Sequence, residues 1–138
     1  LPSALEKALE ALHQAPEAAF AYGAYVEVFP DGRTRVAEPQ RPNEPGLALL
    51  SANIIGMHGT VLYRTAPLQK IGGFDEALAA CEDWDMYLRL TRVHPVTSYS
   101  AIAAQYRRGS GTLSHDFVRM LGAAKTVLSR LSVRTPQE

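Results

Sequence analysis

Apolar residues recur with two different periods along the chain, and the change of period separates the expected helices from the expected strands. Residues Ser3–Gln14 are rich in Ala and Leu, and their first serine and the glutamate three residues later fit a capping box, so a helix is expected. Aromatic and β-branched residues dominate Ala19–Phe29, which indicates a strand. Because Pro30–Gly32 is a turn signal, we expect Arg33–Val36 to return as the second strand of a hairpin.

The middle of the chain predicts shorter elements. The run Leu47–Ile55 is ambiguous by pattern, and we favour a short helix that leads into Asn53. Next, Gly59–Arg64 is expected to be a buried strand. A short helix is expected at Ala66–Ile71, where Pro67 falls in the first turn and is tolerated.

Helical spacing returns in the last third of the chain. Asp83–Val93 is expected to be a helix and Val96–Tyr106 a strand. A final helix is expected at Ser114–Leu131, capped by its serine, and residues 134–138 are expected to fray. Its apolar stripe, which we expect to pack on this domain or on another part of the protein, consists of Phe117, Met120, Leu121, Ala124, Val127, Leu128 and Leu131.

Together these elements predict one α/β domain with a mixed sheet and flanking helices, without the regular βαβαβ run of a complete doubly wound sheet. A length of 138 residues with 46% hydrophobic content allows a real core. The formal net charge is zero and no basic stripe stands out, so nucleic-acid binding is not indicated. No apolar run approaches the ~18 residues of a membrane span. The one cysteine, Cys81, fits a reducing compartment, and we interpret it as a buried small residue.

The stretch Ile71–Leu90 carries the candidate chemistry. Gly72 and Gly73 suit a backbone that turns through positive φ, and Asp75 can accept hydrogen bonds from nearby amides. Acidic residues then open the next helix, where exposed N–H groups and the helix dipole stabilise negative charge. Helical spacing places one set of residues on a common inward face: Trp84, Tyr87, Leu88 and Thr91.

This stretch resembles the inverting, family-two glycosyltransferases of GT-A fold. The resemblance is carried by GGFDE at Gly72–Glu76, by EDWD at Glu82–Asp85 and by the flanking segments VLYR at Val61–Arg64 and QYR at Gln105–Arg107. It implies that residues 1–138 are the C-terminal, acceptor-side part of a GT-A (nucleotide-diphospho-sugar transferase) fold. The nucleotide-binding half is then expected upstream of the first residue.

In that family the acidic pair opens a helix beside the acceptor sugar, so the resemblance implies that Asp83 is the general base. The alternative interpretation of the residues is that Asp83 is only a helix cap, although capping and catalysis are compatible. The helix dipole is expected to lower its pKa and keep it ionised at neutral pH. The same resemblance assigns the acceptor site to five further residues, namely Glu82, Trp84, Asp85, Gly73 and Asp75. From the residues alone, Trp84 suits either sugar stacking or core packing, and Asp85 suits an ion pair with Arg89.

The resemblance places Arg107 and His115 on the diphosphate side of the site, although His115 lies farther along the chain than the family pattern requires. The histidines lack metal-ligand spacing, so no metal ligand is expected in this chain. A divalent cation, Mn²⁺ or Mg²⁺, is implied for the intact enzyme with ligands mostly elsewhere. Gln105–Arg108 lacks the following Trp of processive relatives, which favours a non-processive enzyme.

The implied partners are a nucleotide-sugar donor and a saccharide or lipid-linked acceptor, with a homo-oligomer left open. The expected location is the cytoplasm, and peripheral association of the intact protein with a membrane also stays open. Two other interpretations remain. The chain could be a non-catalytic binding module on the same half-fold, or a generic α/β domain whose acids are only caps.

Overall fold

Strand β1 (Phe20–Val28) is the centre of the sheet, because it pairs along both of its edges. The computed structural model describes residues 2–109 and 116–133. Strands β2 (Thr34–Ala37) and β3 (Leu62–Tyr63) run antiparallel to opposite ends of β1 along one edge, and β4 (Thr97–Arg107) runs parallel to it along the other. The expected hairpin, the expected strands β1 and β4 and the expected mixed sheet are therefore confirmed.

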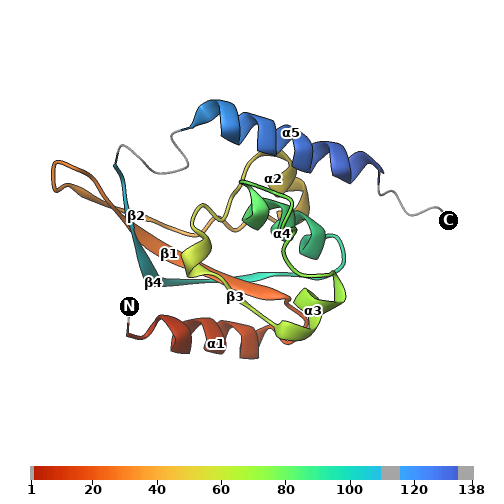
Figure 1. Cartoon of the computed structure of the whole chain (residues 1–138). Coiled ribbons are helices and arrows are strands. Elements are labelled where there is room, and N and C mark those ends of the chain that lie inside the picture. The colour runs from red at the N-terminus through yellow and green to blue at the C-terminus, as the bar shows by residue number, and fades with distance from the viewer. Residues whose placement is uncertain (1, 110–115, 134–138) are drawn as a thin grey trace.

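One face of the sheet is covered by helix α1 (Ala4–Gln14), which lies beneath the strands in Figure 1. Small residues allow this close packing, and they form one core cluster with Tyr99. Gly23 pairs with Tyr99 across the strands, and a Cβ at Gly23 would collide with the tyrosine ring, so glycine is required there. The expected helix is confirmed, although the Ser3 side chain makes no capping hydrogen bond.

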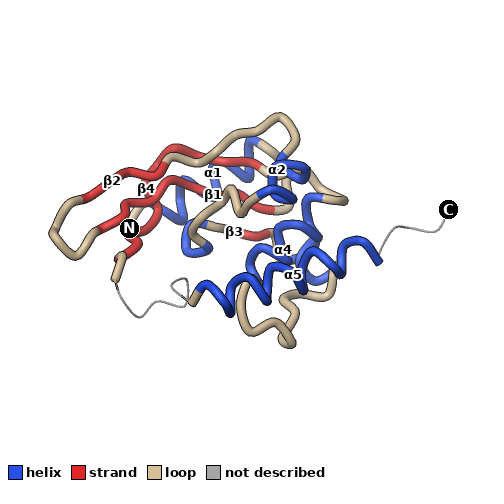
Figure 2. Tube along the Cα trace, turned by 90° about the horizontal axis from the view of Figure 1, so that it is seen from above, coloured by secondary structure: helices blue, strands red, loops and turns tan. Residues whose placement is uncertain are grey.

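The opposite face carries the larger core and the helices that cover it. Helix α2 (Pro45–Ser51) packs on α4 (Glu82–Thr91), and α5 (Phe117–Val133) lies over α4 (Figures 1 and 2). Helix α3 (Thr65–Lys70) follows β3 at the end of the sheet. Phe20 and Tyr22 of β1 point into this core, whereas Ala21 between them faces α1, as the period of a strand requires. The helices expected near these positions are confirmed.

The strand expected at Gly59–Arg64 is mostly wrong. A 3₁₀ turn, η1 (His58–Thr60), occupies its first half, and only the two half-buried residues of β3 pair with the sheet. The backbone N–H and the side-chain hydroxyl of Thr60 both donate to Met57 O, at 3.2 and 2.9 Å. These local hydrogen bonds satisfy the backbone within the turn, and so the segment does not extend.

The apolar stripe of α5 packs only in part. Met120, Ala123, Ala124 and Val127 contact the larger core, but the side chains of Phe117, Leu121 and Leu128 are 79%, 58% and 39% exposed. Within the described residues these three side chains therefore do not pack on this domain, because the helix contacts the fold through the neighbouring part of its surface. Packing on another part of the protein stays a prediction. The serine cap and the tail at residues 134–138 lie outside the described residues.

Candidate active site

The acidic cluster opens α4 as expected, but the cap is shifted. Cys81, not Asp83, is the N-cap residue, and Glu82, Asp83 and Asp85 occupy the first turn. Cys81 has φ 60°, which makes it the one non-glycine residue with positive φ in the described part of the chain. A left-handed conformation costs a residue with a Cβ roughly 1–2 kcal/mol, so the surrounding structure holds this junction in place.

Asp83 lies half-buried beside a cleft, and one of its carboxylate oxygens is hydrogen-bonded within its own helix. Its Oδ1 accepts a hydrogen bond of 2.7 Å from the backbone N–H of Trp84. The cleft has a volume of about 670 Å³. Its polar side is formed by Asn53, Glu82 and Asp83, and α5 supplies an apolar wall. The lining also includes Gly56, Ala80, Cys81, Trp84, Tyr106, Phe117, Met120, Leu121 and Ala124.

The pKa of Asp83 is raised above its ordinary value, which contradicts the expectation of a lowered pKa. Burial of the carboxyl group is the largest cause, and the charge of Glu82 acts in the same direction. The hydrogen bond from Trp84 and the nearby His58 oppose this shift without cancelling it. The sequence predicts the helix dipole, which lowers the pKa of Asp83. It does not predict the burial that raises this pKa, because the groups that desolvate Asp83 come from distant segments.

An aromatic cluster lies next to Asp83. The rings of Tyr63 and Tyr87 stack with centroids 6.5 Å apart, and His58 Nε2 lies 3.3 Å from the Tyr63 hydroxyl. The Tyr87 hydroxyl is fully buried and has no hydrogen-bond partner at acceptable geometry within the described chain. Burial raises the pKa of both tyrosines, so both are neutral near pH 7.

The two neighbours of Asp83 differ in character. Glu82 is exposed at the rim of the cleft, as an acceptor-side residue would be. Trp84 is only 8% exposed, and its Nε1–H donates to Leu49 O at 2.8 Å. The structure therefore favours core packing for Trp84 over sugar stacking.

Asp85 and the glycine loop belong to a second, separate arrangement. The expected ion pair is confirmed, since Arg89 Nε lies 2.7 Å from Asp85 Oδ2. Gly72 and Gly73 have φ values of 87° and 71°, which confirms the expected turn. Asp75 accepts a 2.9 Å hydrogen bond from the Ala77 N–H and also pairs with Arg130. These residues thus have structural contacts in this fold, and their assignment to the acceptor site stays a prediction.

The proposed acceptor set is thus divided between two hollows. Glu82, Asp83 and Trp84 line the cleft described above. Gly73, Asp75 and Asp85 line a smaller pocket of about 320 Å³. Gly56, Tyr106 and the α5 wall were not predicted to line the cleft, because they come from segments distant in sequence and carry no chemical motif.

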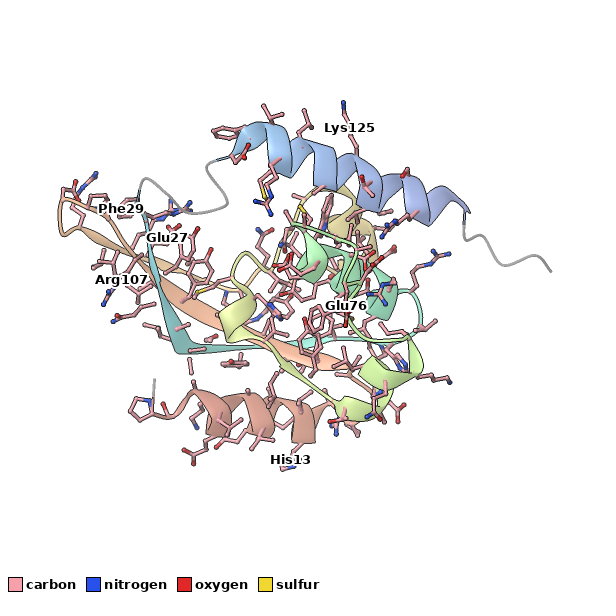
Figure 3. All side chains as sticks on the ribbon, viewed as in Figure 1. His13, Glu27, Phe29, Glu76, Arg107 and Lys125 are labelled. Carbon is pink, nitrogen blue, oxygen red and sulfur yellow. The ribbon has the colours of Figure 1, made fainter. Side chains whose placement is uncertain are left out.

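Of the two diphosphate-side residues, Arg107 does not line the cleft beside Asp83. Arg107 is exposed at the end of β4, close to Glu27 and Phe29 at the hairpin end of the sheet (Figure 3). His115 lies outside the described residues. Arg64 has a structural role, because it donates to Leu12 O and Ala18 O at 2.6 and 3.0 Å.

Within residues 2–109 and 116–133, no group of three or more His, Cys, Asp or Glu side chains could hold a metal ion. The described residues therefore do not fit the divalent cation that the resemblance implies. No helix in the same ranges is long and apolar enough to cross a membrane.

The chain is similar to a protein that is named as a glycosyltransferase. No protein-family model matches it. An uncharacterized glycosyltransferase of Haemophilus influenzae is 34% identical over 101 residues, which cover 72% of this chain and 34% of the relative. The chain thus spans about a third of the length of that relative. This similarity supports a glycosyltransferase relationship, with which the mixed α/β fold is consistent.

Proposed function

We propose that the chain is the acceptor-side part of an inverting, family-two glycosyltransferase of GT-A fold, with Asp83 as its general base. The observation that carries this proposal is the position of Asp83, in the first turn of α4 and beside the cleft. The glycosyltransferase relationship supports the same reaction class.

In this reaction Asp83 removes the proton from an acceptor hydroxyl as its oxygen attacks the anomeric carbon of the donor sugar. The new glycosidic bond forms as the bond to the nucleoside diphosphate breaks, and the electron pair leaves with the diphosphate. A carboxylate with a raised pKa is a stronger base than an ordinary one, which suits proton abstraction near neutral pH. The hydrogen bond from Trp84 fixes one oxygen and thereby orients the carboxylate.

The described residues do not include a site for the nucleotide-sugar donor. A divalent cation would supply positive charge for the leaving diphosphate. Because the described residues offer no ligand set for it, no step is assigned to it. The nucleotide-sugar site is proposed for another part of the protein.

The acceptor is proposed to enter the cleft with its reactive hydroxyl toward Asp83. The polar side of the cleft suits sugar hydroxyls, and the α5 wall suits an apolar group. Both a saccharide and a lipid-linked acceptor are compatible with this lining.

The test is Asp83→Asn in the intact protein, assayed for sugar transfer and for nucleotide-sugar binding. Turnover should fall by roughly 10²–10⁴-fold, while the Kd for the donor stays within about twofold. Glu17→Gln, an exposed acid on the loop after α1, is the matched control and should retain full turnover. Near-normal turnover of Asp83→Asn would exclude the base assignment.

A further inference from the structure

A second hollow lies beside the cleft of Asp83, between α2, α4 and the C-terminal part of α5. It has a volume of about 680 Å³, and we call it the leucine hollow because its lining includes Leu47, Leu50, Leu88 and Leu128. Its two charged lining residues, Glu44 and Arg92, are of opposite sign. Leu47 and Leu50 are 60% and 47% exposed, and Leu128 is exposed as well. Large apolar side chains that stay exposed around a hollow indicate a binding surface.

The leucine hollow and the cleft are neighbours, because the same three segments of the chain line both. In each segment one residue lines the cleft, and another residue, three or four positions away, lines the leucine hollow. These pairs are Trp84 and Leu88 on α4, Ala124 and Leu128 on α5, and Asn53 and Leu50 at the end of α2. A ligand in the cleft can therefore extend along α4 into the leucine hollow.

The chemical character of the lining changes along this direction. Asn53, Glu82 and Asp83 supply polar groups at the N-terminal end of α4, whereas leucines dominate beyond Trp84. Eight positions of α4 separate Asp83 from Thr91 of the leucine hollow, which corresponds to ~12 Å at the rise of a helix. A saccharide matches the polar end but offers nothing to the leucines. A molecule with a polar head and an apolar chain matches both ends.

We propose that the leucine hollow binds the apolar chain of a lipid-linked acceptor whose polar head lies in the cleft beside Asp83. This inference rests on the proposed function, and it chooses between the two acceptor classes with which the cleft by itself is compatible. The chain would remove the exposed surface of Leu47, Leu50 and Leu128 from water, which is the source of its binding free energy.

The deciding experiment is a nitrogen-15 NMR titration of the labelled chain with dodecyl maltoside below its critical micelle concentration. The detergent should shift the amide signals of Leu47, Leu50 and Leu128 saturably, whereas maltose at the same concentration should leave them unchanged. Leu50→Gln and Leu128→Gln should each raise the Kd for the detergent roughly three- to tenfold. Both side chains are exposed, so both variants should keep the fold.

Val118→Gln is the matched control. Val118 is an exposed apolar residue of α5, but it lines neither the cleft nor the leucine hollow. The Kd of this variant should stay within about twofold of the wild-type value. An equal loss of affinity in Val118→Gln and Leu128→Gln would mean that the detergent adheres to any exposed apolar side chain, and it would overturn the proposal.

The competing occupants of the leucine hollow give different results. Shifts of the leucine signals with protein concentration, without any response to dodecyl maltoside, would assign the surface to a second copy of the chain. Detergent binding by this chain but not by the intact protein would mean that another part of the protein covers the leucines. Either result would overturn the proposal.

Kinetics of the intact protein test the link to the acceptor. Leu128→Gln should raise the KM for a lipid-linked acceptor roughly three- to tenfold, and kcat and the KM for the saccharide alone should stay within about twofold. Equal increases of both KM values would contradict an apolar-chain site. The NMR titration involves no sugar transfer, so its failure is distinguishable from failure of the base assignment at Asp83.

Discussion

Arg89 and Asp85 form a buried ion pair, in which Arg89 Nε lies 2.7 Å from Asp85 Oδ2 and the two side chains are 15% and 6% exposed. The same guanidinium donates to Ile71 O at 3.0 Å and to Gly73 O at 2.8 Å. Arg89 of α4 therefore connects the glycine loop, Ile71–Gly73, to the helix that carries Asp83. Three consecutive residues of the motif thus differ in role: Asp83 is the candidate base, Trp84 packs in the core and Asp85 forms an ion pair.

Removing the acid of this pair should destabilise the fold strongly. We expect Asp85→Ala to cost about 3–5 kcal/mol of unfolding free energy, because it leaves a buried guanidinium without its counter-charge. Asp31→Ala is the comparison, since Asp31 pairs with Arg33 on the surface, where loss of an exposed ion pair should lower the free energy of unfolding far less. Urea unfolding of the two variants measures the difference. Similar small losses would contradict a fastening role for Arg89.

The glycine loop should not tolerate a side chain. Gly73→Ala should cost about 1–2 kcal/mol, because φ is 71° there, although no atom lies within 4 Å of the position that a Cβ would take. Gly122→Ala on α5 should instead stabilise the fold by about 0.5–1 kcal/mol, since Gly122 lies inside a helix with the same open space. Thermal unfolding of both variants checks the opposite signs, and a loss at Gly122 equal to that at Gly73 would contradict the backbone argument.

Trp84 should matter for stability and not for the acceptor. Trp84→Phe removes the hydrogen bond to Leu49 O and leaves that buried carbonyl without its donor, at an expected cost of about 1–3 kcal/mol. Steady-state kinetics of the intact protein should give an acceptor KM within about twofold of the wild type. A KM increase of more than about tenfold, with stability unchanged, would restore sugar stacking as its role.

The raised pKa of Asp83 predicts a change of stability with pH. A carboxyl group with a folded-state pKa above its unfolded value contributes stability below the unfolded pKa, and this contribution is lost as pH rises through the folded pKa. Ionised Asp83 therefore destabilises the fold at neutral pH. Asp83→Asn should raise Tm by a few degrees at pH 7 and give no gain near pH 3.5, where the wild-type carboxyl is largely protonated in both states. Glu17→Gln measured at both pH values is the control, and a lower Tm for Asp83→Asn at pH 7 would contradict the burial argument.

The sequence predicted the elements whose cause is local. The acids at the start of α4, the turn glycines and the strong helical period of α1 all act within a few residues, and each element formed near its expected place. The expected strand at Gly59–Arg64 failed where Thr60 closes a turn on Met57, a competition between local hydrogen bonds that apolar composition does not reveal.

The environment of the candidate site could not be predicted in the same way. Core packing of Trp84 is decided by a carbonyl 35 positions earlier, that of Leu49. The pKa of Asp83 is raised mainly by burial. The cleft residues around Asp83 include Asn53, Tyr106 and residues of α5, which lie far from it in the sequence. Such distant contacts exist only in the folded chain. The motif located Asp83, but only the fold reveals its burial.

Because Cys81 lies against α5, the rate of its alkylation can report movement of that helix. Its Sγ lies 3.9 Å from Met120 O of α5, its side chain is 9% exposed, and the sequence contains one cysteine. Burial, together with the charges of Asp83 and Glu82, raises the pKa of this thiol and slows its reaction with alkylating reagents. Labelling would then proceed mainly through molecules in which α5 has lifted from the cleft. The alkylation rate of Cys81 in the wild-type chain therefore measures how often α5 moves away from the cleft beside Asp83.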